Sequence, residues 1–335
     1  MNETPQESPK PTLDTSSVSA AEQTNTALKK TKRMMMIAVS VIVILVVLML
    51  IGGGYWLVYV TGSNSAPVSA VKNVLPLPAG QVNGKFVSLK TYETRVAATE
   101  NFYKKQEELQ LGLTDQTPTG AEIKQQEFDR LVEEAIVNAY AKEQGVAVTD
   151  QDVNEYFDQN ILPQAKGGID EVNTTLKDLY NWSVDDFKRE ILREAVLRNT
   201  LQEKLSKDDS QNSAAKEKVT TLHTEIKDGK KSFEDAAKES SDDTVSAEQG
   251  GSLGTITKGQ TVKEFEDVAF SIAVGELSEP FVTQYGWHIL KVNKRDDAAG
   301  SAEVQHILVM TKQLDDVIQE KVDAATIKSF VSGIE

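Results

Sequence analysis

The sequence predicts an α+β protein in which a helical unit is followed by a smaller unit of antiparallel strands and flanking helices, all preceded by a membrane-spanning helix. Three observations support this. Apolar side chains recur every three or four residues through residues 122–140, strand patterns occupy residues 287–293 and 304–310, and residues 34–60 carry no charge. The expected divisions are 1–33 (tail), 34–60 (span), 61–79 (linker), 80–210 (helical unit), 211–310 (strand-containing unit) and 311–335 (C-terminal helix).

The composition is that of an acidic, folded protein. Of 335 residues 39% are hydrophobic, and 36 basic against 51 acidic side chains give a net charge of −15. A chain this acidic is not expected to bind nucleic acid. The absence of cysteine excludes disulfides, thiolate metal sites and a cysteine nucleophile. We expect neither a cofactor nor a metal ion.

The segment that begins at Met34 and ends at Val60 is predicted to cross a membrane. As a helix at ~1.5 Å per residue it reaches roughly 40 Å, more than the ~30 Å of a hydrocarbon core. The alternative is a cleaved secretory signal with a site at Val68, Ser69 and Ala70, although signal cores are shorter. Basic residues at 29–33 precede the segment, so the positive-inside rule keeps the N-terminus in the cytoplasm and the folded units outside.

The segments on either side of the apolar stretch are predicted to lack a packed core. Residues 1–33 are rich in Ser, Thr, Pro, Glu and Gln, with too few large apolar side chains to offset chain entropy. We interpret them as a disordered cytoplasmic tail. Residues 61–79 contain Gly, Ser, Asn and Pro and are interpreted as a linker to the folded part.

The folded part is predicted to open with a short hairpin and to continue as helices. Asn83 and Gly84 form a turn signal between apolar residues, and a helix is expected from Leu89. A second helix runs from Glu122 and stops at Gly145. Two further helices are expected, one capped by Thr149 and Asp152 and one over residues 184–205.

A polar segment, residues 207–215, is predicted to separate the helical unit from the next one. The helix that follows contains Val219, Leu222 and Ile226 and ends at Gly229. His223 lies on this helix, where we expect it to have a packing or surface position and no catalytic role.

Residues 250–292, GGSLGTITKGQTVKEFEDVAFSIAVGELSEPFVTQYGWHILKV, resemble the second half of a parvulin-type peptidyl-prolyl isomerase domain. Residues 82–96, 131–157 and 187–205 are similar to the N-terminal chaperone domain of the SurA, PrsA and PpiD family of extracytoplasmic folding factors. The resemblance implies a membrane-anchored isomerase and chaperone that acts on unfolded or proline-containing secreted polypeptides.

The parvulin resemblance also implies roles for individual residues. Asp243 matches a position that faces the substrate carbonyl, although an Asp in this Ser-rich loop is equally consistent with a turn. His288 and His306 match a histidine pair that is hydrogen-bonded beneath the active site. Substrate-binding roles fall on Phe265, Thr261, Leu253, Thr283 and Tyr285. Thr261 replaces a residue that is usually Met or another large apolar side chain, and Ser252 replaces a usual Asp.

The opening strand of the family pattern is displaced in this sequence. Its His-Ile-Leu-Val core comes last, at residues 306–309, instead of preceding the first helix. We expect a circular permutation in which residues 287–293 pair with residues 304–310. If the numbers of opposed residues add to an even sum, His288 and His306 lie on one face. The alternatives are a truncated second domain and a strand-exchanged dimer.

Three functions are compatible with these patterns. The first is a membrane-anchored prolyl isomerase and chaperone. The second is a chaperone that uses a degenerate, inactive parvulin scaffold, which the replacements at Thr261 and Ser252 would favour. The third is a membrane-tethered interaction module, for which only the predicted topology argues.

Overall fold

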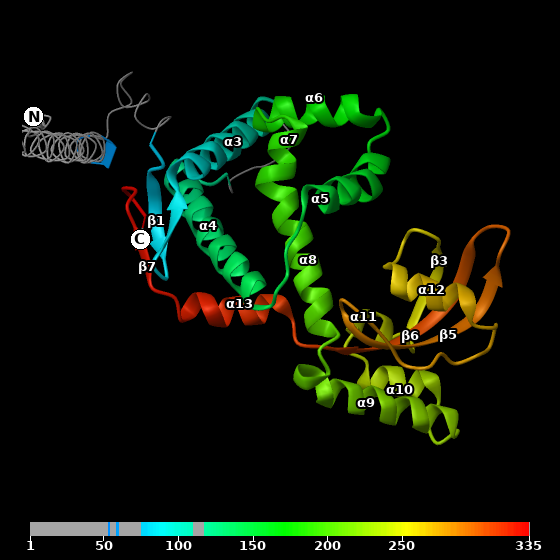
Figure 1. Ribbon diagram of the computed structural model, residues 1–335. Helices are drawn as coiled ribbons and strands as arrows, with labels where there is room; N and C mark the ends of the chain where they lie inside the picture. Colours follow the sequence, from blue (N-terminus) through cyan, green and yellow to red (C-terminus); the bar gives the residue numbers. More distant parts are fainter. Residues whose placement is uncertain (1–52, 54–57, 60–74, 110–116, 335) are drawn as a thin grey trace, which may run out of the picture. The chain divides into compact units, whose positions relative to one another are not determined.

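The computed structural model describes residues 53, 58, 59, 75–109 and 117–334 (Figure 1). The chain divides into two units, residues 1–77 and 78–335. The predicted tail, and most of the predicted span and linker, lie outside the described residues. Among the residues that are described, no helix has the length and apolar character needed to cross a membrane. Within the second unit we call residues 78–206 and 312–334 the helical lobe and residues 207–311 the sheet lobe.

A small antiparallel sheet joins the two ends of the helical lobe. Its strands are β1 (Pro78–Val82), β2 (Lys85–Ser88) and β7 (Ile327–Ser329), in the order β2-β1-β7. Asn83 and Gly84 have φ of 48° and 82°, as a tight turn between β1 and β2 requires, so the predicted hairpin is confirmed. Strand β7 was not expected, because residues 311–335 were predicted to form only a helix.

Helices make up the rest of the helical lobe. They are α3 (Leu89–Glu108), α4 (Gly120–Glu143), α5 (Asp150–Tyr156), the π-helical turn η2 (Phe157–Ile161), the 3-10 turn η3 (Leu162–Gln164), α6 (Gly168–Tyr180), α7 (Val184–Phe187), the π-helical turn η4 (Lys188–Leu192), α8 (Arg193–Ser206) and α13 (Leu314–Asp323). Thr149 and Asp152 form the predicted capping box, and Gly145 has a left-handed φ of 65° just after α4.

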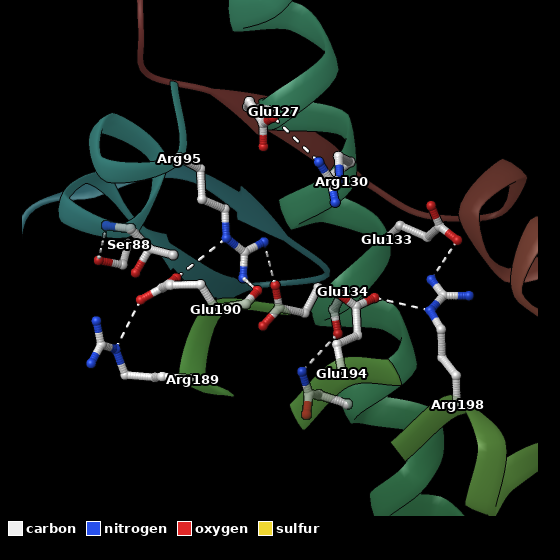
Figure 2. Close-up of polar contacts among 12 residues, drawn as sticks. Ser88, Arg95, Glu127, Arg130, Glu133, Glu134, Arg189, Glu190, Glu194 and Arg198 are labelled. Carbon is white, nitrogen blue, oxygen red and sulfur yellow. Dashed lines mark hydrogen bonds and ion pairs between the residues drawn. The ribbon is translucent and has the colours of Figure 1, made fainter. Parts of the chain in front are cut away.

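Buried Arg95 ties three helical segments of this lobe together (Figure 2). Its guanidinium on α3 lies 2.7 Å from Oε2 of Glu134 on α4 and 3.3 Å from Oε2 of Glu190 on η4. It also donates to the Glu190 carbonyl oxygen at 2.8 Å. Burial raises the pKa of Glu134, and the charge of Arg95 opposes that shift. Each charge is therefore kept in the interior by its partners, and loss of one would leave another buried without compensation.

The sheet lobe contains a four-stranded antiparallel sheet with helices on both faces. Its elements are α9 (Asp209–Lys227), α10 (Phe233–Ser240), α11 (Thr244–Ala247), β3 (Ser252–Thr257), α12 (Lys263–Ser271), β4 (Phe281–Thr283), β5 (Gly286–Asp296) and β6 (Ser301–Met310). The strand order is β3-β6-β5-β4, with the long β5–β6 hairpin at the centre (Figure 1).

Side chains alternate between the two faces of this sheet, and each face has its own core. On one face Ile289, Ile307 and Val309 pack with apolar residues of α9 and α10. On the other face Leu290 and Val304 pack with Phe265 and Ala269 of α12 and their neighbours. Helices α9 and α10 therefore cover one side and α12 the other (Figure 1). His223 is buried on α9, as a packing residue would be.

The displaced strand completes the sheet within the same chain. Strand β6 lies between β3 and β5, and it opposes Leu290 to His306 and His288 to Leu308. Both pairs add to the same even sum, so the two histidines share a face. The predicted pairing of residues 287–293 with residues 304–310 is confirmed. The structure therefore needs neither a truncated second domain nor an exchanged strand to account for β6.

The C-terminal segment packs against the helical lobe, and its helix is shorter than the predicted residues 311–335. Lys321 of α13 lies 3.1 Å from Glu143 of α4, and Asp315 lies 3.3 Å from Arg198 of α8. The helix ends at Asp323, and the chain then extends into β7. Pairing of β7 with β1 satisfies backbone groups that a longer helix would have satisfied internally.

The polar segment 207–215 is not an unstructured break. Asp208 accepts a hydrogen bond from the Ser210 amide and caps α9, which begins at Asp209. Inside α9 the backbone is non-helical only at Asn212, where φ is −121°. The Asn212 side chain donates to the Leu205 carbonyl at 2.7 Å and accepts from the Lys312 amide at 2.8 Å. The polar residues of this segment therefore cap α9 and form hydrogen bonds at a buried kink, and they do not mark a flexible linker.

A glycine substitution tests how closely β6 is enclosed. A Cβ at Gly251 would lie 2.4 Å from the His306 carbonyl oxygen, whereas a Cβ at Gly275 would meet nothing within 4 Å; both glycines have left-handed φ, 84° and 87°. We expect Gly251→Ala to lower the free energy of unfolding of the sheet lobe by about 2 kcal/mol more than Gly275→Ala. Urea denaturation followed by tryptophan fluorescence measures both. Equal losses would show that β6 can move away at no cost.

Candidate active site

The candidate site lies on the α12 face of the sheet and centres on a pair of buried histidines. The rings of His288 on β5 and His306 on β6 stack with centroids 5.6 Å apart, and their Nδ1 atoms are 3.4 Å apart. Each histidine is less than a tenth exposed. Strands β5 and β6 form an antiparallel hairpin, and its register brings these two side chains together.

Asp243 lies at one end of the histidine pair. Its Oδ2 is 2.8 Å from Nε2 of His306, and it also accepts a 2.6 Å hydrogen bond from the Ser246 hydroxyl. Asp243 caps helix α11 by accepting from the Ser246 amide, so it has the turn role as well as contact with the site. Burial by itself would raise the pKa of Asp243, but the hydrogen bonds from Ser246 and His306 lower it overall.

Thr283 lies at the other end of the pair. Its Oγ1 is 2.9 Å from Nε2 of His288 and accepts a hydrogen bond from the Tyr285 amide at 3.1 Å. Thr283 is fully buried, so the structure places it behind the histidines instead of on a substrate-facing surface. A hydroxyl has one hydrogen to donate besides its two lone pairs, so Thr283 can accept from the Tyr285 amide and donate to His288 at the same time.

One arrangement of protons satisfies the whole chain of contacts. Ionised Asp243 accepts from Nε2–H of His306, which leaves Nδ1 of His306 as an acceptor. Nδ1–H of His288 then donates to it, and Nε2 of His288 accepts from Thr283. Both histidines are neutral in this arrangement. Each one has its tautomer determined by the partner at the far end.

Burial keeps the histidines in this neutral state. Desolvation, with a contribution from His306, lowers the pKa of His288 to about 3. Desolvation also lowers the pKa of His306, although the charge and hydrogen bond of Asp243 oppose that shift. Neither ring is therefore protonated near neutral pH.

Aromatic side chains form the apolar wall above the histidines. Phe265 of α12 is 4% exposed, and its ring meets His288 and His306 edge-on at centroid distances of 5.4 and 5.7 Å. Phe281 of β4 stacks on His288 at 5.4 Å. Phe281 was not among the residues predicted for the site. Its place at the start of a short strand gave no local signal of this contact.

A cavity of about 810 Å³ opens over this wall. The predicted residues that line it are Leu253, Thr261, Phe265, Tyr285, His288 and His306. Asp243 and Thr283 reach it only through the histidines that they contact. The Thr261 hydroxyl oxygen is buried without a hydrogen-bond partner among the described residues, as expected where a hydroxyl replaces an apolar group. The prediction missed Ser246 and the cavity residues that come from the helical lobe.

The pH dependence of stability tests the neutral state of the histidines. In the unfolded chain both protonate below about pH 6.5, whereas in the folded chain their lowered pKa values keep them neutral. The unfolded state thus gains protons first, so stability should fall as pH decreases from 6.5 toward 4.5, by at most about 1.4 kcal/mol per pH unit for each histidine.

Urea denaturation at several pH values measures this slope, and His288→Gln should reduce it. Asp243, whose folded pKa is lowered, contributes a loss only below the unfolded value of about 3.9, outside this window. A slope that is the same in the wild type and in His288→Gln would contradict a buried, neutral His288.

Two domain families match the chain. Residues 26–198 match the SurA-like N-terminal domain and residues 196–294 match the PPIC-type PPIASE domain. The second match ends within β5, so it includes His288 but not His306. His306 enters the site only through the pairing of β6 described above.

Individual relatives carry the names of folding factors. Chaperone SurA of Alcanivorax borkumensis is 44% identical over 93 residues, which cover 28% of this chain and 21% of that protein. Foldase protein PrsA of Geobacillus kaustophilus is 29% identical over 215 residues, 63% of this chain and 68% of that protein.

Among solved structures, the peptidylprolyl isomerase PrsA from Bacillus anthracis aligns with a TM-score of 0.22 and 21% identity, covering 58% of this chain and 85% of that one. The SurA-like match extends over more than half of the 335 residues. The chain therefore belongs to the family of proteins with a SurA-like N-terminal domain, joined here to a PPIC-type PPIase domain.

Proposed function

We propose that this chain is an extracytoplasmic peptidyl-prolyl cis-trans isomerase that also acts as a chaperone for unfolded secreted polypeptides. The observation that carries the proposal is the hydrogen-bonded Asp243–His306–His288–Thr283 chain, with both histidines neutral, beneath the aromatic wall of a cavity. The matched PPIC-type PPIase domain and the names of the SurA and PrsA relatives support the same function.

Prolyl isomerisation requires a pocket that binds the twisted peptide bond, and it requires no nucleophile. Rotation about a prolyl bond faces a barrier of ~18–20 kcal/mol because amide resonance must be lost. An apolar wall such as that of Phe265 can hold the proline ring, and polar groups at its edge can complement the carbonyl of the twisted bond. Neutral, hydrogen-bonded histidines suit a rigid support for that wall, and neither is required to attack the substrate.

Asp243 does not itself line the cavity, so its charge acts on a bound substrate from behind His306. Its carboxylate is partly exposed, at 25% of the side chain, and its pKa is lowered, so it is ionised at neutral pH. A negative charge near the carbonyl disfavours the planar amide, whose oxygen is the more negative, relative to the twisted state. Ser246 and His306 hold the carboxylate in place for this role.

We also propose that residues 34–60 anchor the protein in the cytoplasmic membrane with the folded unit outside. The uncharged length of this segment and the basic residues before it support that topology. It would hold the isomerase where secreted chains emerge unfolded.

A protease-coupled assay on a prolyl tetrapeptide tests the enzymatic function. We expect wild-type activity well above background, and losses of about tenfold or more for Asp243→Ala and for His288→Ala. Asp185→Ala, an exposed change in the helical lobe, should have no effect. Wild-type activity at background would refute catalysis on such substrates. Suppression of client aggregation would then favour a chaperone with an inactive parvulin scaffold.

A substitution at Thr261 tests the proline pocket in the opposite direction. Replacing this unpartnered hydroxyl by the family's usual apolar residue, Thr261→Met, should raise kcat/KM about threefold or more, mainly by lowering KM. Thr255→Met, on an exposed position of β3, should change neither constant. If both variants behave like the wild type, Thr261 does not contact the proline.

A further inference from the structure

The cavity of the candidate site is larger than a proline pocket needs to be and continues onto the helical lobe. Beyond the residues already described, its lining includes Tyr156, Gln159, Asn160 and Asn199. These side chains lie about 90 residues or more before the histidines in sequence and outside the matched PPIase domain, except for Asn199 near its start. A volume of about 810 Å³ is that of a site for a ligand of several residues.

The lining residues from the helical lobe, which form a second wall of the cavity, lie mainly where α5 passes into a π-helical turn. Tyr156, Gln159 and Asn160 follow each other at i, i+3 and i+4, so they occupy one side of the segment where α5 passes into the π-helical turn η2. Single π-helical turns recur at functional sites because they shift side chains relative to a regular helix. Asn199 extends the same wall from α8.

Five of the polar side chains that line the cavity are amides. Gln159, Asn160 and Asn199 come from the helical lobe, and Gln260 and Gln284 come from the sheet lobe. Within the described part of the chain, the side chains of Gln159, Asn199 and Gln284 make no hydrogen bond. Asn160 donates one hydrogen bond to the Tyr156 carbonyl, and Gln260 accepts one from the Thr257 amide. Most of their bonding capacity is therefore directed to solvent.

An amide side chain offers both donors and an acceptor, which is the pattern of a peptide group. Several amides along one cavity can therefore bind an extended backbone without selecting its side chains. Charge contributes little selection, because the charged side chains of the lining are one Lys, Lys263, and one Glu, Glu266. This chemistry fits an unfolded polypeptide and gives no preference for anions or cations.

We propose that Gln159 and Asn199 of the helical lobe, with Asn160 beside them, bind the backbone of the residues that flank the target proline. This inference rests on the proposed isomerase function and extends it to the substrate class. The site then takes an extended unfolded chain that contacts both lobes at once, and a short peptide occupies only the pocket at Phe265.

Comparison of a short and a long substrate tests this proposal on the full chain. The variant is Gln159→Ala/Asn199→Ala, and the control is Gln151→Ala/Asn138→Ala, which removes the same residue types from exposed helical positions that do not line the cavity. The substrates are a prolyl tetrapeptide and an unfolded protein whose refolding is limited by prolyl isomerisation. Binding of a labelled peptide that extends several residues on both sides of its proline is measured in parallel.

For the variant we expect kcat/KM on the protein substrate to fall about tenfold through KM, and long-peptide affinity to fall about as much, as two lost hydrogen bonds predict. Activity on the tetrapeptide should stay within about twofold of the wild type. The control should match the wild type in every assay.

Equal performance of variant and wild type on the long substrates would overturn the proposal. An equal loss on the tetrapeptide would overturn it as well, because the change would then have disturbed the proline pocket itself. If the wild type is inactive on both substrates but the variant still loses peptide affinity, the isomerase function is refuted and the shared binding surface stands.

Discussion

The antiparallel pairing of β5 with β6 is the interaction on which the site depends. It places His288 and His306 on one face with their rings stacked, and it gives β3 a partner on the other side of β6. Both faces of the resulting sheet are covered, by α9 and α10 on one side and by α12 on the other. A slip of one residue would turn one histidine into the opposite core. The contact between the two histidines therefore depends on the register of this hairpin.

Burial of the histidine pair sets a second constraint, which is electrostatic. Desolvation lowers the pKa of both rings, so both remain neutral near neutral pH and act as hydrogen-bonding groups. Asp243 and Thr283 complete the chain at its two ends, and no polar atom of either ring lacks a partner. Such a satisfied network is rigid. It suits a catalyst that binds a distorted bond more than one that transfers protons.

The displaced strand also changes how the two lobes are joined. From His306, β6 runs directly into Thr311, whose hydroxyl donates to Ser206 of α8 at 3.1 Å, and then into α13 of the helical lobe. Gln202 of α8 reinforces the junction: it donates to the Gln284 carbonyl at 3.0 Å and accepts from the Leu314 amide at 2.6 Å. Gln284 is next to Thr283, so these contacts of the helical lobe end one residue from the Asp243–His306–His288–Thr283 chain.

Local sequence patterns determined much of this protein. The Asn83-Gly84 turn, the capping box at Thr149 and the helix end at Gly145 depend on neighbours within a few residues, and each was readable from the chain alone. The resemblance to the parvulin pattern identified the histidine pair. Because side chains alternate along a strand, the two histidines share a face only if the numbers of opposed residues add to an even sum.

Tertiary structure decided what depends on partners distant in sequence. Contacts between segments distant in sequence decide three features that no local pattern predicts. These are the register of β5 and β6, the pairing of β7 with β1, and the burial of Thr283. The amides at Gln159 and Asn199 have the appearance of ordinary surface residues until folding brings them to the cavity of the histidines. Side-chain periodicity specifies which face of a helix or strand a residue occupies, but only the tertiary structure specifies which other segments pack against that face.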